Sequence, residues 1–283
     1  MKRKAIIAML VATLAVITCI GLAACSGSSS SSSASSTSTT TSSASSTSGA
    51  TGSYKLITAG ELTIGASQDF PPFENLNSST GKPEGFSIDL MNALCDQMGL
   101  KCTYLPSIKF DALIPALVSG TKMDVAVSSF TITPEREQEI DFTDPYFDSN
   151  QSIVVMKNSG ITSVDQLAGK KIGAQSGTTG QEWAEENVPT ATTVAFDEVT
   201  AVFAALQSGQ VDAVSIDLPV AQNMIKNGYS DATIIKETPT GEQYGIAVNK
   251  DNPELTKALN EALATIKANG TYDQIYDKWF KVA

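Results

Sequence analysis

The sequence contains no histidine, and no third cysteine lies near the close pair Cys95 and Cys102. These absences argue against a metal centre, because zinc sites draw mainly on histidine and cysteine ligands. The missing histidine also removes the commonest general acid or base, so acid–base chemistry would fall to carboxylates. We therefore expect no metal and no cofactor.

Basic residues are scarce, with 19 Lys and Arg against 30 Asp and Glu. Three of these cations are Lys2, Arg3 and Lys4; without them 16 basic and 30 acidic residues remain, a net charge of −14. Such a charge disfavours nucleic acid or an anionic membrane surface as partner. Its plainest meaning is the solubility of a secreted protein.

Long apolar runs are also absent, except at the N-terminus. The three cations there precede about twenty mostly apolar residues that end in "LAAC", Leu22 to Cys25, which predicts an export signal over residues 1–24. Small residues before a cysteine resemble the lipobox of bacterial lipoproteins, which implies cleavage before Cys25 and its lipidation. An uncleaved signal anchor is the alternative, since such a run could just span a bilayer. We expect a protein held at the cell membrane by the lipid on Cys25, facing the extracytoplasmic side.

Residues 26–53 are almost entirely Ser, Thr, Ala and Gly, so with Cys25 they predict a flexible tether over residues 25–53. Its random-coil reach is roughly 30 Å. The folded body starts at Tyr54 and is long enough for one large or two smaller cores. Outside the cytoplasm, the pair Cys95 and Cys102 in "CDQMGLKC" favours a disulfide over two free thiols.

Strand-like and helix-like segments alternate along this body, which predicts an α/β fold with parallel sheets covered by helices. Strands are predicted at 61–66, 102–106, 124–127, 171–174 and 212–216, and helices at 86–98, 110–120 and 199–209. Two stretches echo one another: "LVSGTKMDVAV" (117–127) and "LQSGQVDAV" (206–214) share a helix end, a Ser-Gly stop and an Ala-Val strand. The echo indicates two lobes of similar design, although such junctions also recur by chance.

Ligands of open parallel sheets bind beyond the carboxyl ends of the strands. After the strand at 124–127 the chain continues "SSFTITPER", in which Thr133 suits an N-cap and Pro134 the first helical position. Arg136 then projects from the first turn, where it could bind a carboxylate or merely pair with Glu137 or Glu139.

The strand of the second echo ends in Asp217, which either caps the following helix or binds a cation. A third junction, "KIGAQSGTTGQ", places Thr179 at the start of a helix. Arg136 and Asp217, if they face one another, would grip a zwitterion such as an α-amino acid. Phe70, Phe73 and Phe110 are either core residues or an apolar wall for the ligand.

Seven stretches occur in a characteristic order: "IGASQDFPPFE", "GFSIDLMNAL", "FDALIPAL", "MDVAVSSFTITPEREQEIDFTDPY", "GAQSGTTGQ", "VDAVSID" and "NGTYDQIYDKWF". From about residue 55 to 280 the chain thereby resembles the polar amino acid-binding proteins of ABC importers. The resemblance implies a two-lobed periplasmic-binding-protein fold (type II), in which each lobe is a mainly parallel sheet flanked by helices. Lobe 1 would comprise residues 54–148 plus 247–283, lobe 2 residues 152–242, and two hinge crossings would lie near 148–152 and 241–247.

By position, the resemblance implies that Arg136 binds the ligand's α-carboxylate with Ser129, Thr131 and Thr179, and that Asp217 takes the α-ammonium. Phe70 and Phe110 would sandwich the ligand, and Cys95 and Cys102 match a disulfide of some members. Ser67 and Gln175 depart from the family's usual residues. With Glu74, they fit a polar or basic side chain, and arginine is the single choice.

These features predict a receptor, not an enzyme, that delivers an amino acid to an ABC permease and acts as a monomer. An enzyme on the same fold, such as a cyclohexadienyl dehydratase using Glu74, is the alternative. A sensor module is less favoured, because the chain ends three residues after Phe280.

Overall fold

The computed structural model of the protein describes residues 54–281. The predicted export signal, Cys25 and the tether to residue 53 lie outside the described residues, as do residues 282–283. Within residues 54–281, no helix combines the length and the apolar character needed to cross a membrane.

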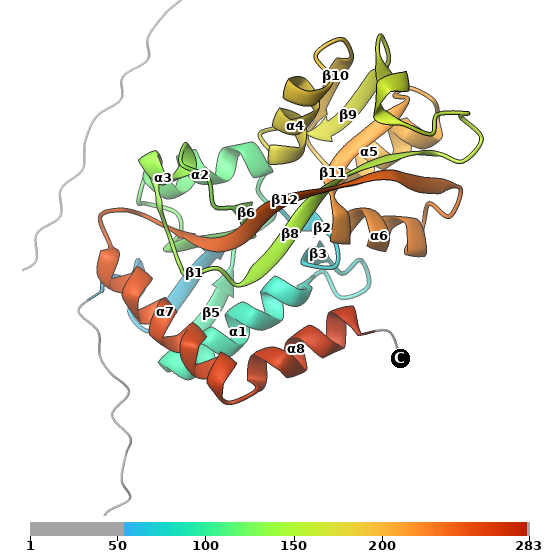
Figure 1. The fold of residues 1–283 in the computed structure, drawn as a ribbon. Helices are drawn as coiled ribbons and strands as arrows, with labels where there is room; N and C mark the ends of the chain where they lie inside the picture. The colour runs from blue at the N-terminus through green and yellow to red at the C-terminus, as the bar shows by residue number, and fades with distance from the viewer. Residues whose placement is uncertain (1–53, 282–283) are drawn as a thin grey trace, which may run out of the picture. The chain divides into compact units, whose positions relative to one another are not determined.

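One nine-stranded sheet forms the centre of this body (Figure 1). Its strands are β1 (Glu61–Gly65), β5 (Lys101–Tyr104), β6 (Val125–Thr131), β7 (Asp141–Phe142), β8 (Phe147–Met156), β9 (Lys171–Gln175), β10 (Thr192–Phe196), β11 (Ala213–Asp217) and β12 (Ala232–Val248). The order is β10-β9-β11-β8-β12-β6-β1-β5, and β7 also pairs with β12. A separate small sheet joins β2 (Asp69–Phe70), β3 (Glu74–Leu76) and β4 (Pro83–Glu84).

The predicted α/β fold with mainly parallel pairing is confirmed. On one side β1 is parallel to β5 and β6, and on the other β9 is parallel to β10 and β11. The two parallel sets are joined into one sheet through β8 and β12, which run antiparallel to each other and to their neighbours. Both predicted crossings therefore fall within long strands. We call the residues on either side of β8 and β12 lobe 1 and lobe 2, with the bounds predicted above.

Helices cover the sheet on both sides. They are α1 (Phe86–Met98), α2 (Phe110–Val118), α3 (Arg136–Glu139), α4 (Thr179–Asn187), α5 (Val199–Gln207), α6 (Leu218–Asn227), α7 (Pro253–Ala268) and α8 (Thr271–Phe280), with a short 3₁₀ helix η1 (Val164–Leu167). The C-terminal helices α7 and α8 return to pack against α1 (Figure 1). Segments from the two ends of the described chain thus pack together, as the predicted lobe 1 requires.

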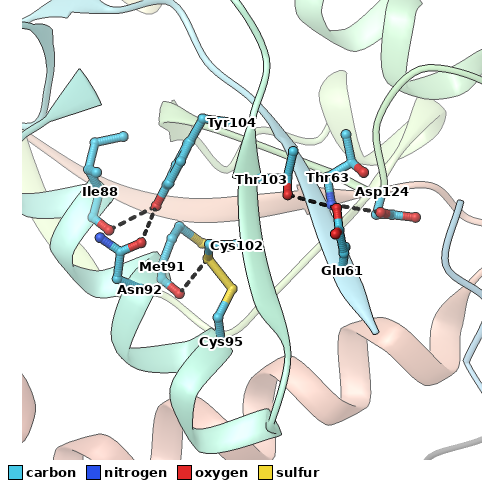
Figure 2. Close-up of a disulfide and its surroundings, with 10 residues drawn as sticks. All are labelled: Glu61, Thr63, Ile88, Met91, Asn92, Cys95, Cys102, Thr103, Tyr104 and Asp124. Carbon is cyan, nitrogen blue, oxygen red and sulfur yellow. Dashed lines mark hydrogen bonds between the residues drawn. A yellow bond between two sulfur atoms is a disulfide. The ribbon is translucent and has the colours of Figure 1, made fainter. Parts of the chain in front are cut away.

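Helix α1 follows its sequence pattern, with Leu90, Met91 and Leu94 buried on one face. Its Cys95 forms a disulfide with Cys102 of β5, over a Cα–Cα distance of 5.8 Å. Figure 2 shows this bond joining the helix to the neighbouring strand. The predicted disulfide is thus present in the structure.

The two echoed junctions have the same backbone form. Helix α2 leads to β6 through Gly120 (φ +67°), and α5 leads to β11 through Gly209 (φ +74°). A residue other than glycine is strained at such angles. The shared conformation explains why the Ser-Gly stop occurs twice.

Helix α3 begins later than predicted, at Arg136 instead of Pro134. Strand β6 ends at Thr131, which pairs with Tyr244 of β12, and residues 134 and 135 form a turn before the helix. Thr133 is therefore not the N-cap residue, although its Oγ1 accepts a 3.3 Å hydrogen bond from the Arg136 N–H.

Phe73 is a core residue with no exposed surface. Its ring centroid lies 4.8 Å from that of Phe147, 5.3 Å from Tyr244 and 5.4 Å from Phe280. One aromatic cluster thereby packs β8, β12 and α8 against the segment between β2 and β3 that carries Phe73.

Candidate functional site

A small cavity lies where the carboxyl ends of β6, β9 and β11 meet. Its volume is about 10 Å³, which is room for about one water molecule. A larger guest therefore enters only if the lobes separate. The lining residues are Phe70, Phe110, Ser128, Ser129, Thr131, Arg136, Gln175, Thr178, Thr179 and Asp217.

The cavity brings together eight of the ten candidates chosen from the sequence. Ser67 and Glu74 are the two that do not line it. Phe70 and Phe110 both reach it while remaining almost fully buried.

Arg136 is a cation without an ionic partner in the part of the chain that the structure describes. Its Nη1 donates to the Thr131 carbonyl at 2.8 Å and its Nη2 to the Gly177 carbonyl at 3.0 Å. The guanidinium also lies 5.4 Å from the ring centroid of Phe110, a cation–π distance. Burial lowers the pKa of Arg136, and the carboxylates of Glu182 and Asp217 oppose that change. A surface pair with Glu137 or Glu139 is not formed, and the group is placed to receive an anion.

Asp217 ends β11 and is 8 % exposed. It occupies the N-cap position of α6, but its side chain makes no capping hydrogen bond. Its carboxylate instead accepts a hydrogen bond from Gln151 Nε2. Burial, and then repulsion by Glu242, raises the pKa of Asp217 well above its usual value. The site therefore contains a buried acid that forms no ion pair with any residue from 54 to 281.

The two lobes touch around the cavity. The hydroxyl oxygens of Thr131 and Thr179 are 3.4 Å apart. Lys109 forms an ion pair with Asp197, and Ser176 Oγ donates to Asp111 Oδ2 at 3.2 Å. The structure therefore has the lobes closed onto each other at this edge of the sheet.

Ser129 has a backbone φ of +49°, in the left-handed region that serine rarely adopts. Its Oγ donates to both carboxylate oxygens of Glu74, at 3.1 Å each. Glu74 has no exposed surface, and burial raises its pKa to about 8. Glu74 thus lies behind the cavity wall and positions Ser129.

Ser67 is separated from the cavity by its partners. Its Oγ donates to Asp69 Oδ1 at 2.5 Å, and Asp69 Oδ2 accepts from Gln175 Nε2 at 3.2 Å. Asp69 also accepts from the Val199 N–H at the start of α5 in lobe 2, at 2.8 Å. A carboxylate therefore joins the lobes at the Gln175 side of the cavity.

The sequence analysis missed five polar residues of this region. Ser128 and Thr178 line the cavity beside residues already chosen, so the junction loops could have indicated them. Asp69, Gln151 and Glu242 act through hydrogen bonds to lining residues. For Glu242 the only signal was its position in a predicted crossing.

The chemistry of the site suits a small molecule that carries both charges. Arg136 can bind an anionic group, Asp217 a cationic one, and the hydroxyls of Thr131 and Thr179 supply further hydrogen bonds. Between residues 54 and 281, no three His, Cys, Asp or Glu side chains come together in a way that could hold a metal ion.

Comparison with known proteins gives a consistent match. The family model described as bacterial extracellular solute-binding proteins, family 3, matches residues 62–282. The ABC transporter arginine-binding protein 1 of Escherichia coli (strain K12) is 38% identical over 227 residues, which cover 78% of this chain and 91% of that protein.

Solved structures similar to this chain are also amino acid-binding proteins. An ancestral arginine-binding protein bound to arginine is 43% identical with a TM-score of 0.73, covering 78% of this chain and 98% of that one. Bound to glutamine, it is 42% identical with a TM-score of 0.75, covering 80% and 100%. An ancestral amino acid-binding protein described as a precursor of cyclohexadienyl dehydratase is 37% identical, with a TM-score of 0.73 and coverage of 78% and 96%.

Proposed function

The chain belongs to the bacterial extracellular solute-binding proteins, family 3, and we propose that it captures an amino acid between its lobes and delivers it to an ABC importer permease. One observation carries the proposal: Arg136 and Asp217, opposite in charge, line one cavity from different lobes. An α-amino acid presents the matching carboxylate and ammonium groups.

The residues that line the cavity would each bind one part of the amino acid. Arg136 binds the α-carboxylate with Ser129 and Thr131 of lobe 1 and Thr179 of lobe 2. Asp217 takes the α-ammonium, while Phe70 and Phe110 enclose the side chain. Lobe 1 would comprise residues 54–148 plus 247–283, and lobe 2 residues 152–242. Strands β8 and β12 would form the hinge between them.

Binding would be coupled to closure. A ligand shifts an open–closed equilibrium only by its differential affinity for the two states. Residues from both lobes reach the cavity, so full contact exists only when the lobes are closed. The permease would recognise the closed shape.

Arginine is the ligand that we propose. Gln175 lines the cavity and donates to the carboxylate of Asp69, which would offer an anionic partner to a guanidinium that takes the place of this amide, although Ser67 itself is uncharged. An arginine fork suits such a carboxylate. The relatives named for arginine agree with this choice, whereas a glutamine complex of one relative marks glutamine as the competitor.

The protein would be held at the membrane by acyl chains on Cys25, after removal of residues 1–24. The segment 25–53 would serve as a tether for a monomeric receptor. Acyl anchoring needs no spanning helix. Metabolic labelling with a palmitate analogue tests this proposal, with Cys25→Ala as the variant expected to lose the label.

A thermal-shift screen against the twenty amino acids tests the function, because a ligand that binds only the native state raises the melting temperature. We expect L-arginine to give the largest shift, and calorimetry then supplies its affinity. A screen in which no amino acid shifts the melting temperature would refute the proposal.

The alternative, an enzyme like cyclohexadienyl dehydratase, draws support from the similarity to an ancestral precursor of that enzyme. Glu74, its candidate acid, lies behind Ser129 with no exposed surface, out of contact with any guest of the cavity. Incubation with prephenate or arogenate tests this reading, and dehydration of either would support it.

A further inference from the structure

Strand β12 places a second carboxylate beside Asp217. The Glu242 carboxylate accepts hydrogen bonds from Gln151 Nε2 at 3.0 and 3.2 Å. It also accepts from Thr131 Oγ1 at 3.2 Å and Thr179 Oγ1 at 3.3 Å. One side chain on the hinge thus contacts lobe 1, lobe 2 and the other hinge strand.

This cluster has too few hydrogen-bond donors. Gln151 Nε2 faces Asp217, Glu242 and Thr179, yet an amide nitrogen carries only two hydrogens. Gln151 is 1 % exposed, and its Oε1 has no hydrogen-bond partner among the described residues. Asp217 accepts from this contested amide, and a second carboxylate beside it in so buried a place opposes its ionisation.

The charged groups around this cluster do not supply the missing hydrogen-bond donors. Arg136 acts on both carboxylates through space, but its hydrogen bonds go to carbonyl groups. Glu135, directly before α3, and Glu182 of α4 act on Arg136 and add negative charge. Tyr244 of β12 interacts with Asp217, and its hydroxyl donates to Ser149 Oγ at 3.0 Å.

We propose that Asp217, crowded by the carboxylate of Glu242, carries a proton before the ligand arrives, and that the α-ammonium of an amino acid displaces this proton to solvent when it binds Asp217. Glu242 is then a positioning residue, which acts on the ligand through Asp217 and Gln151. The ammonium brings three N–H donors to the cluster, and the leaving proton passes to a water or buffer base. This inference rests on the proposed function.

Calorimetry in buffers of different ionisation enthalpy measures the proton directly. Binding of L-arginine and L-glutamine is titrated at pH 6 in phosphate and in bis-Tris buffer, which both ionise near this pH, and the dependence of the observed enthalpy on the ionisation enthalpy of the buffer gives the protons exchanged. We expect release of up to one proton by the unmodified protein and clearly less by Glu242→Gln, because Asp217 stays buried but loses the neighbouring carboxylate that further raises its pKa. Glu237→Gln, an exposed change on the same strand, should release the same proton as the unmodified protein.

A second measurement does not depend on any variant. Below the raised pKa of Asp217, the affinity of the unmodified protein should fall by up to tenfold for each unit of decreasing pH. Binding without proton release and without this slope would overturn the proposal, as would equal release by Glu242→Gln. If neither amino acid binds at all, the proposed function itself is wrong, and this outcome differs from binding without proton release, which contradicts only the proton proposal.

Discussion

Arg136 Nη2 of lobe 1 donates a 3.0 Å hydrogen bond to the Gly177 carbonyl of lobe 2. The residue proposed to bind the ligand's carboxylate therefore also joins the lobes. Since Nη1 is engaged with Thr131, an incoming carboxylate competes with carbonyl oxygens for this fork. It does so with full charge, which makes the stronger hydrogen bond.

Arg136→Ala should remove most ligand binding. Truncating one partner of a buried charge pair costs about 2–5 kcal/mol. Arg136→Lys is the matched control, because it keeps the charge but loses the two-pronged guanidinium. Its ligand affinity should lie between that of the unmodified protein and that of Arg136→Ala. Titration calorimetry measures all three, and near-normal affinity in the alanine variant would remove Arg136 from the site.

Gly177→Ala should weaken ligand binding through the closed state. Gly177 has φ +74°, and a Cβ there would lie 3.2 Å from Asp111 Cβ of lobe 1. Gly169→Ala is matched, since φ is +72° and nothing lies within 4 Å of its added Cβ. Both variants should lose about 1 kcal/mol of stability from backbone strain. Only Gly177→Ala should also lose several-fold in ligand affinity, and equal affinities would contradict a tight closure at this point.

Asp69→Asn should reduce the preference for a charged side chain. The ratio of the affinities for L-arginine and its neutral isostere L-citrulline is measured in the unmodified protein and in Asp69→Asn. A general effect of the variant on lobe closure changes both affinities equally and cancels in this ratio. The unmodified protein should prefer arginine, and the variant should lose most of that preference because the carboxylate is gone. An unchanged ratio would place the guanidinium elsewhere.

Glu74 should make the protein less stable as pH rises. Its folded pKa is about 8 against an ordinary value of 4.5, so between these values the folded state keeps a proton that the unfolded state has lost. The free energy of unfolding then falls by up to about 1.4 kcal/mol per pH unit as pH rises through this window. Urea titrations from pH 5 to 8 should show a flatter dependence for Glu74→Gln, whose amide mimics the protonated acid. Asp217→Asn, which leaves Glu74 unchanged, should retain the contribution of Glu74.

Removal of the disulfide should lower stability without affecting ligand binding. A closed loop of eight residues contributes about 2.5 kcal/mol by chain entropy. The double variant Cys95→Ala, Cys102→Ala should therefore melt at a lower temperature than the unmodified protein. A reductant should lower the melting temperature of the unmodified protein and leave that of the variant unchanged. The ligand's affinity should be unchanged, because neither cysteine lines the cavity.

Much of the architecture was predictable because its signals are local. Periodicity identified α1, and turn chemistry identified the stops at Gly120 and Gly209. The end of β6 at Thr131 was not predictable, because Thr131 pairs with Tyr244, which lies more than a hundred residues further along the sequence. The joining of both parallel sets into one sheet depended on the same kind of long-range pairing.

The sequence by itself determined the α/β alternation, the strand ends at which Arg136 and Asp217 stand, and the cysteine pair. These follow from hydrophobic period, residue type and short spacing. Only the tertiary structure decided that Glu74 lies behind Ser129, and that Glu242 shares Gln151 with Asp217. Such contacts arise when the closed lobes and the hinge strands bring distant side chains into one buried space, where the shortage of donors, and not the residue type, sets their chemistry.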